Sequence, residues 1–511
     1  MKLNQLKMGA VLSYGQMTLN VLIGLIYTPV MLKLLGKSEY GLYNTVSSTI
    51  SMLSIMSLGF QSSYIRFFAE YKAKGEREKI HTLNGVFLMV FSAIGILALL
   101  CGLYLSFHLE YVFDQGLTPS EYRTARVLML MLTVNLAISF PMSTFTSIIS
   151  AHERYVFLKL MGMMKTVLSP MLTLPLLLMG YQSIALVAVT VAVSVLTDLC
   201  YLFYSRKKLG VRFVFSGMER RLARSLFSYS IFIAIHIIVD QINNNMDKFL
   251  LGRFVGTEEV AVYAVGYTIY HYYMAFSVGI SAVFSPRIHK IVNSTLDDRP
   301  EQKKQLTDLF LRIGRIQFLL LALIVSGFVF FGQEFLHFWA GEGYENSYYV
   351  AVLLMIPATV PFIQNAGIEI QRALNRHQVA NLCYLGMAIL NLVISIELCQ
   401  RYGAVGSATG TAISFVLANG IMINIYYHKR CNLDIVKFWK SIGRLVLGLV
   451  FPVTAGCIMK YFVDFHRISF LLAGILGYTG IYCVSMWLIG MNAYEKDLVR
   501  GVLGRLRRSK Q

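Results

Sequence analysis

The feature that most constrains the fold is a series of long apolar runs, separated by short stretches that hold most of the charged residues. Each run is about 20 to 27 residues long. A helix rising 1.5 Å per residue needs about 20 apolar residues to cross a hydrocarbon core of about 30 Å. The spans of a membrane β-barrel would read as alternating segments of about ten residues, and the sequence has no such alternation. The pattern therefore predicts an all-α protein that crosses a membrane many times.

We expect about fourteen transmembrane helices and little mass outside the bilayer. Only 14% of the 511 residues are charged, whereas a soluble domain carries about 25%. The predicted spans are 8–33, 41–65, 82–107, 124–150, 155–179, 182–204, 227–250, 260–285, 311–332, 347–371, 378–400, 404–427, 441–463 and 468–491.

Basic residues lie mainly in the even-numbered connections between these spans and in the two tails. The odd-numbered connections 108–122 and 333–346 contain acidic residues and no Lys or Arg. Because cytoplasmic loops are enriched in Lys and Arg, both termini are predicted to be cytoplasmic. This topology accounts for the net charge of +19 without nucleic-acid binding, since the bases are scattered over many short loops.

The sequence contains an internal repeat. At an offset of 220 residues Gly36 meets Gly256, Glu39 meets Glu259 and Tyr43 meets Tyr263. A second match, 151–154 with 374–377, has an offset of 223. Spans 1–6 therefore resemble spans 7–12 in the same membrane orientation, which predicts two pseudo-symmetric six-helix lobes with a cleft between them. The predicted parts are an N-lobe (1–215), a C-lobe (216–430), and spans 13 and 14 with a basic cytoplasmic tail (431–511).

Polar residues on spans 1 and 7 are the first candidates for a transport site. On span 7 they recur every three or four residues and would form one stripe along a regular helix. A polar stripe that faced lipid would be costly, so it is expected to line a water-filled cavity or to bond to neighbouring helices. The candidates are His236, Asp240, Asn243, Asn244 and Asp247 on span 7, and Gln16, Asn20 and Tyr27 on span 1.

Further candidates lie on spans 5, 8 and 10. Lys165 is a base inside span 5, and an intramembrane charge is a functional candidate by default. Span 8 carries aromatic side chains that could pack, anchor at an interface or contact a sugar or lipid. Prolines kink span 10 next to its polar residues. The candidates on spans 8 and 10 are Tyr267, Tyr270, His271, Gln364, Asn365 and Glu369.

The sequence lacks the nucleotide-binding and metal-ligand motifs that would indicate an enzyme or an ATP-driven pump. There is no GxxxxGK[ST] phosphate loop, so the chain is not itself an ATP-driven pump. The seven cysteines form no CxxC pair or metal-ligand spacing. We therefore expect no enzyme activity, no metal and no cofactor. A membrane glycan polymerase or ligase, the rival enzyme class, would be expected to carry a large outer loop with acidic, basic or His residues.

Two segments resemble a known transporter family. Residues 34–71, LLGKSEYGLYNTVSSTISMLSIMSLGFQSSYIRFFAEY, are similar to the first hairpin of polysaccharide flippases of the multidrug/oligosaccharidyl-lipid/polysaccharide exporter superfamily. Residues 401–414, RYGAVGSATGTAIS, resemble the start of their twelfth helix. The resemblance implies alternating access between two lobes. It also implies transfer of a polyprenyl-pyrophosphate-linked oligosaccharide for O-antigen, capsule, exopolysaccharide or teichoic-type polymers.

Alternative functions follow from the same plan. A lipid II flippase would be chemically close, and a cation-coupled multidrug exporter would usually have twelve spans rather than fourteen. The implied partners are membrane lipid, the lipid-linked oligosaccharide, and the polymerase and glycosyltransferases of the same pathway. Proton or sodium coupling is expected to involve Asp240, because it lies deep in span 7 near His236. Lys165 is expected to bind the phosphate of the cargo.

Overall fold

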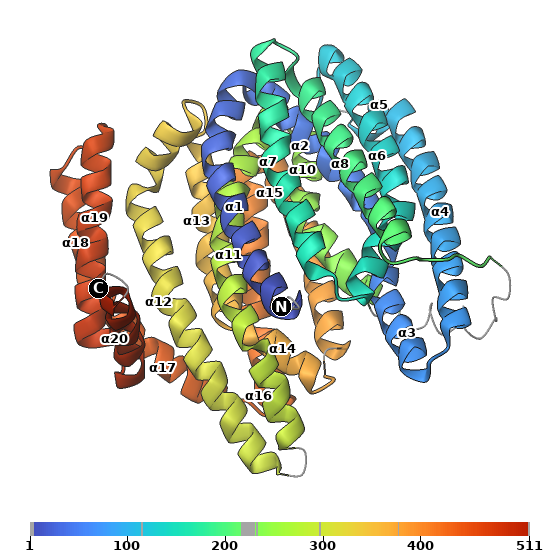
Figure 1. Cartoon of the computed structure of the whole chain (residues 1–511). Helices are drawn as coiled ribbons and strands as arrows, with labels where there is room; N and C mark the ends of the chain where they lie inside the picture. Colours follow the sequence, from blue (N-terminus) through green and yellow to red (C-terminus); the bar gives the residue numbers. More distant parts are fainter. Residues whose placement is uncertain are drawn as a thin grey trace. The chain divides into compact units, whose positions relative to one another are not determined.

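The structure, a computed structural model, describes residues 5–113, 116–215, 230, 233–295, 298–376 and 378–508. All regular secondary structure in these residues is helical, in agreement with the predicted all-α fold (Figure 1). Residues 216–229, which begin at the predicted boundary between the lobes and include the start of predicted span 7, lie outside the described residues. So does residue 377, the last position of the second repeat match.

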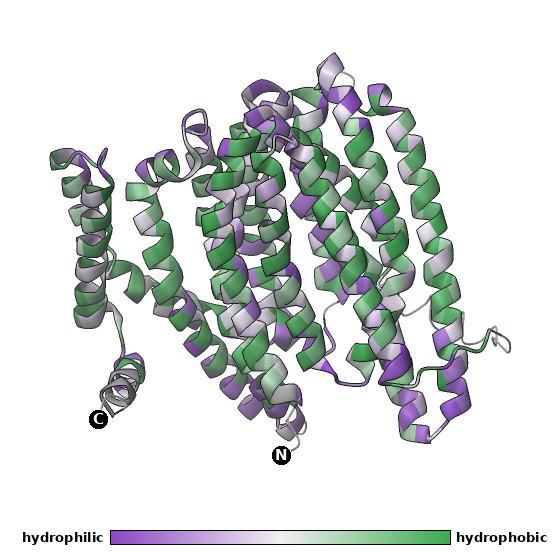
Figure 2. Ribbon diagram, turned by 45° about the horizontal axis from the view of Figure 1, so that its top comes forward, coloured by the Kyte–Doolittle hydropathy of each residue, from purple (hydrophilic) through white to green (hydrophobic). Residues whose placement is uncertain are grey.

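Nine helices of the described chain are long and apolar enough to cross a membrane. Figure 2 shows apolar residues along their lengths and hydrophilic residues gathered at their ends and in the connections. Eight of them correspond to predicted spans 1, 3, 4, 5, 6, 9, 10 and 14: α1 (Gln5–Leu35), α4 (Arg77–Phe107), α6 (Pro119–Ala151), α7 (Tyr155–Leu178), α8 (Gln182–Lys207), α12 (Arg299–Ala340), α13 (Asn346–Ile363) and α19 (Ile468–Ser485) continuing into η4 (Met486–Gly490).

The ninth contains two predicted spans joined end to end. It comprises α15 (Gln378–Phe415), η3 (Val416–Met422) and α16 (Ile423–Lys429), and spans 11 and 12 meet within α15 at Gly403. Gly403 has φ 57° and ψ −138°, a conformation that glycine adopts without a steric penalty. Close by, a side chain on Gly406 would overlap the carbonyl of Leu398. The chain therefore bends at the predicted connection.

The remaining predicted spans are broken or polar. Span 13 is a pair of helices bent by 41°, α17 (Ile435–Leu447) and α18 (Val450–Phe462). Spans 2, 7 and 8 are not among the nine long apolar helices of the described chain. Span 2 comprises α2 (Lys37–Met52), η1 (Leu53–Ser57) and α3 (Phe60–Lys74). The described part of span 7 comprises residues 233–241, η2 (Ile242–Met246) and α10 (Asp247–Phe254). Span 8 corresponds to α11 (Thr257–Ser294). With these, the helices account for fourteen spans. The shorter helices α5 (Leu109–Val112), α14 (Ala366–Ala373) and α20 (Ala493–Arg508) lie between or after them.

The residues group into two compact units, 1–264 with 388–407 and 265–387 with 408–511. A cluster of aromatic side chains on α3 and α4, including Tyr64, Phe87 and Phe91, forms a core of the first unit. Phe331, Phe465 and Tyr478 lie in a core of the second unit, where α12 meets α19. The division into lobes at residue 215 remains a prediction.

The repeat is visible in equivalent turns. The turn after α6 and the turn after α14 each contain a non-glycine residue with positive φ, Glu153 and Asn375. The backbone hydrogen bonds are also equivalent, from Arg154 N to Ile149 O and from Arg376 N to Gln371 O. These pairs give an offset of 222 residues here, so the offset of 223 from the sequence was wrong by one. The two turns share too few identical residues for the sequence to align them unambiguously. The residues with left-handed backbone, Glu153 and Asn375, fix the alignment.

Candidate functional site

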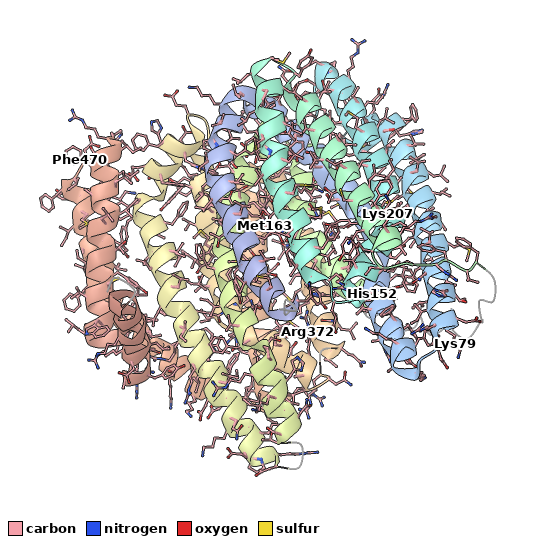
Figure 3. All side chains as sticks on the ribbon, in the orientation of Figure 1. Lys79, His152, Met163, Lys207, Arg372 and Phe470 are labelled. Atoms are coloured by element: carbon pink, nitrogen blue, oxygen red, sulfur yellow. The ribbon has the colours of Figure 1, made fainter. Side chains whose placement is uncertain are left out.

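The predicted polar residues of α1 contact α7 within the first unit. The side chain of Asn20 accepts a hydrogen bond of 2.6 Å from Thr166 Oγ1. Gln16 lies directly over Gly162, where any side chain would overlap its amide. Tyr27 lies near Thr173 of α7. Hydrogen bonds and a small residue allow two membrane helices to approach closely. Met163, labelled in Figure 3, lies on the same stretch of α7, next to Gly15.

Lys165 lies on α7 beside an acidic residue of the neighbouring helix. Its ammonium group donates to Ser194 Oγ at 3.3 Å and attracts the carboxylate of Asp198, both on α8. Asp198 also accepts a hydrogen bond of 3.4 Å from Ser139 on α6. The sequence analysis singled out Lys165 as an intramembrane charge, and the structure places it within electrostatic reach of Asp198. Opposite charges offset part of each other's cost of leaving water.

The polar stripe predicted on span 7 is divided by a π-helical turn. His236 and Asp240 precede it, 3.6 Å apart, with 45% and 51% of their side chains exposed. Asn243 and Asn244 lie within the turn, η2. A π turn inserts one residue, which rotates the following side chains by about 100° relative to a regular helix. The expectation that all five residues share one face is therefore wrong, and Asp247 points elsewhere.

Asp247 is buried, with 3% of its surface exposed. One carboxylate oxygen accepts a hydrogen bond of 2.7 Å from Tyr263 and the other accepts one of 2.6 Å from Ser407. Lys248, the next residue, interacts electrostatically with Asp247. Sequence reasoning missed Lys248, although a base within a membrane span is itself a signal. The two hydrogen bonds of Asp247 join α10 to α11 and α15 in the first unit.

The aromatic residues of span 8 belong to the second unit and differ in exposure. Tyr270 is buried between Phe362 and Phe415, with ring centroids 5.8 and 6.3 Å away. Tyr267 lies against Tyr270 and His271, and His271 is exposed. Tyr270 is therefore a packing residue, whereas His271 remains accessible to a ligand.

The polar residues of span 10 lie at and after the break between α13 and α14. Gln364 is buried and donates to Asn424 Oδ1 at 2.8 Å. Asn365 contacts Ser277 at 3.5 Å. Glu369 accepts hydrogen bonds from Ser285 and Arg372, at 2.9 and 2.8 Å. Pro357 and Pro361 precede the break, as the kink predicted from the sequence requires.

Equivalent glutamates of the repeat make equivalent contacts in the first unit. Glu39, in the first turn of α2, accepts a hydrogen bond from Ser183 near the start of α8. Glu259, in the first turn of α11, accepts one of 2.7 Å from the backbone N–H of Ala404, just after the bend at Gly403. Each glutamate thus connects the start of one span to the start of another four spans later, in both halves.

A third glutamate joins the two repeat motifs. Glu121, at the start of α6, accepts hydrogen bonds of 2.6 Å from both Ser38 and Thr257. The two hydroxyl oxygens are 3.4 Å apart. A cavity of 630 Å³ in the first unit opens beside them, lined in part by Glu39, Glu258 and Glu259. We call Ser38, Glu121 and Thr257 the outer latch, because they lie on the side predicted to be extracytoplasmic.

An apolar groove lies on the last two spans in the second unit. Its volume is 560 Å³, and its lining contains one polar side chain, Ser485. The lining residues are Phe451, Gly477, Gly480, Ile481, Val484, Ser485, Leu488 and Ile489. Glycines at 477 and 480 leave room for a narrow apolar ligand such as a hydrocarbon chain.

Comparison with known sequences decides the family. The profile of the family described as "Polysaccharide biosynthesis protein" matches residues 6–292, more than half of the chain. The chain belongs to this family. Among its relatives, an uncharacterized membrane protein of Bacillus subtilis, EpsK, is 23% identical and covers 96% of both chains. A probable low-salt glycan biosynthesis flippase of Haloferax volcanii, Agl15, is 25% identical over 45% of this chain and 48% of its own.

Solved structures share the fold of this family member. The lipid II flippase MurJ, in an inward closed conformation, aligns with a TM-score of 0.69, 14% identity, and coverage of 96% of this chain and 99% of its own. An inward-facing multidrug resistance transporter of the MATE family, from the MOP superfamily, aligns at 0.57 and 13% identity. It covers 84% of this chain and 99% of its own. This member of the polysaccharide biosynthesis family thus has the fold that these two transporters share.

Proposed function

We propose that this protein transfers a polyprenyl-pyrophosphate-linked oligosaccharide from the inner to the outer leaflet of a bacterial cytoplasmic membrane, for the synthesis of a cell-surface polysaccharide. The observation that carries the proposal is the family match together with the apolar groove on spans 13 and 14. A polyprenyl-linked cargo presents a long apolar chain that can lie in such a groove, whereas a drug without a lipid anchor has no such chain.

Two other cargoes are the alternatives. Lipid II has the same polyprenyl-pyrophosphate anchor, so the groove fits it equally well. A cation-coupled drug exporter is disfavoured, because the MATE structure accounts for only 84% of this chain.

Reconstituted transport tests the proposal. Purified protein in vesicles should expose a fluorescent lipid-linked oligosaccharide to a membrane-impermeant reagent much faster than protein-free vesicles do. The same vesicles are then loaded with lipid II and, separately, with a cationic dye under a proton or sodium gradient. Transport of the dye alone would refute the proposal, and transport of lipid II alone would assign the second cargo.

Asp240 is our candidate for ion coupling. It is half exposed and lies 3.6 Å from His236, so its carboxylate can exchange a proton or a cation with solvent. Asp240→Asn should reduce transport and weaken its dependence on pH and sodium. Wild-type rates with the wild-type ion dependence would exclude this role.

Lys165 is our candidate for binding the phosphate of the cargo. It is exposed on α7 and is held by Ser194 and Asp198 rather than by a full ion pair. Lys165→Gln should raise the cargo concentration needed for half-maximal transport. Lys159→Gln, on the same helix, is the matched control. Equal effects of the two changes would argue against a specific site.

A further inference from the structure

A small pocket with a basic rim lies at one end of the second unit. It occupies 240 Å³ where α11, α12, α14 and α16 end or begin (Figure 1). Arg372, labelled in Figure 3, marks the end of α14 beside it. These connections are the even-numbered ones, which are predicted to be cytoplasmic. The lining residues are Val292, Arg299, Gln302, Lys303, Leu306, Ala373, Leu374, Asn375, Arg376, Cys431 and Asn432.

Backbone and side-chain hydrogen bonds fix the walls of this pocket. The Gln302 amide donates to the carbonyls of Val292 and Thr295, both at 3.3 Å, and so ties α12 to α11. Asn375 and Asn432 each adopt a left-handed conformation, with φ of 54° and 56°. Asparagine tolerates this conformation better than most residues, so both turns are stable as built. The pocket is therefore shaped before any ligand arrives.

The pocket is lined by three cationic side chains, Arg299, Lys303 and Arg376. Its lining also includes the buried residues Val292, Leu306 and Cys431. Within the described parts of the chain, none of the three is in an ion pair with a carboxylate.

The nearest acids along α12 are already engaged. Asp298 accepts a hydrogen bond from the N–H of Glu301, and Glu301 accepts one from Gln305. Within the described residues, neither carboxylate is in an ion pair with the three cations of the rim.

The first half of the repeat provides an internal comparison. At the 220-residue offset, Lys79 meets Arg299. Lys79 is paired with Glu76 at 3.1 Å, and Lys74 is paired with Glu70 at 2.6 Å. The hydrogen bond and charge of Lys74 hold the pKa of Glu70 below its usual value. Two lysines of this turn in the first half are thus paired with glutamates, whereas Arg299 is in no ion pair in the described part of the second half.

We propose that this pocket binds a phosphate group. Guanidinium groups match the geometry of phosphate oxygens, and a lysine adds a further charge-assisted hydrogen bond. The volume is below the range of about 300 to 1,000 Å³ that is usual for drug-sized ligands, so a phosphate or diphosphate group fits better than a larger anion. The group comes from an anionic lipid headgroup or from a free phosphate compound. This inference does not depend on which cargo the protein moves.

Binding to the full-length protein tests the proposal with both sources. One arm measures pyrophosphate binding to detergent-solubilised protein in phosphate-free buffer. The other measures how much anionic phospholipid co-purifies from mixed vesicles with phosphatidylcholine. The triple variant R299Q/K303Q/R376Q should lose roughly tenfold or more in affinity in at least one arm. Loss in the pyrophosphate arm identifies a free ligand, and loss in the vesicle arm alone identifies a headgroup.

Two controls separate a site from general positive charge. Lys304→Gln removes a neighbouring exposed charge that does not line the pocket and should leave binding unchanged. The conservative variant K303R/R376K keeps all charges and should retain most binding even if the triple variant is poorly folded. Unchanged binding by the folded triple variant in both arms would overturn the proposal. So would an equal loss in Lys304→Gln.

Discussion

At the scale of single residues, Asp247 shows how the protein holds a carboxylate within its helices. The side chain is buried, and each of its oxygens accepts a hydrogen bond from a hydroxyl group. A buried charge without such partners would cost several kcal/mol. Asp247 is therefore better explained as a structural link between helices than as part of an open polar stripe.

Tyr263→Phe tests this interpretation. The change removes one donor to Asp247 and should lower the free energy of unfolding by about 1.5 to 3 kcal/mol, the range for hydrogen bonds to charged groups. Thermal unfolding of the purified protein measures the effect. Tyr402→Phe, which removes the hydroxyl of an exposed tyrosine, should change stability by less than about 0.5 kcal/mol. If both variants unfolded at the wild-type temperature, the Tyr263–Asp247 bond would contribute nothing.

At the scale of helices, α20 is fastened to the second unit by one buried ion pair. Arg315 on α12 contacts both carboxylate oxygens of Glu495 and also donates to carbonyls of Ser441 and Gly490. Only 7% and 4% of the two side chains are exposed. The pair thus joins α12, α17, the end of span 14 and α20.

Glu495→Gln should release α20. Removing one partner leaves a buried guanidinium without its counter-charge, which costs about 3 to 5 kcal/mol. We expect faster proteolysis after the basic residues of α20, measured by limited trypsin digestion and mass spectrometry. Asp497→Asn is the matched control, because the Asp497–Arg500 pair is exposed and exposed pairs contribute about 0 to 1 kcal/mol. Equal digestion rates for Glu495→Gln and the wild type would contradict the role of the ion pair.

Gly41 determines how closely α2 approaches the start of α11. A side chain at Gly41 would overlap the carbonyl of Thr257, so Gly41→Ala must push the two helices apart. We expect a loss of about 1 to 3 kcal/mol of stability, the usual cost of overpacking. Gly386→Ala on α15 meets no atom within 4 Å and should be neutral or stabilising by up to about 1 kcal/mol. Thermal unfolding of both variants measures these changes in stability. If Gly41→Ala unfolded at the wild-type temperature, the close approach of α2 to α11 would be excluded.

The sequence predicted the spans well and the polar sites less well, for physical reasons. The length of an apolar run indicates a membrane helix directly, so the nine long apolar helices of the described chain were all predicted, including the one in which two spans meet at Gly403. The π turn at 242–246 leaves no mark in the periodicity, so the position of Asp247 was missed. The proximity of Lys165 to Asp198 depends on how α7 packs on α8, which the spacing of residues along one helix does not reveal.

At the scale of the whole molecule, the outer latch connects the starts of spans 2 and 8, which are equivalent in the two halves of the repeat. Glu121 binds Ser38 and Thr257 together, and their oxygens are 3.4 Å apart. Alternating access requires that a path closed on one side of the membrane opens on that side later in the cycle. If this latch closes the outer side, it must break before cargo can leave.

A reversible crosslink across the latch therefore tests alternating access. In a background without the seven native cysteines, the variant S38C/T257C should form a disulfide on oxidation, because the two side chains already touch. Transport of lipid-linked oligosaccharide in vesicles should fall to background on oxidation and recover with reductant, while either single cysteine variant should respond to neither. Full transport by the crosslinked protein would mean that the cargo leaves by a path that does not separate spans 2 and 8. In that case the close contact of the two repeat motifs would serve stability alone, and the opening would have to be sought elsewhere in the molecule.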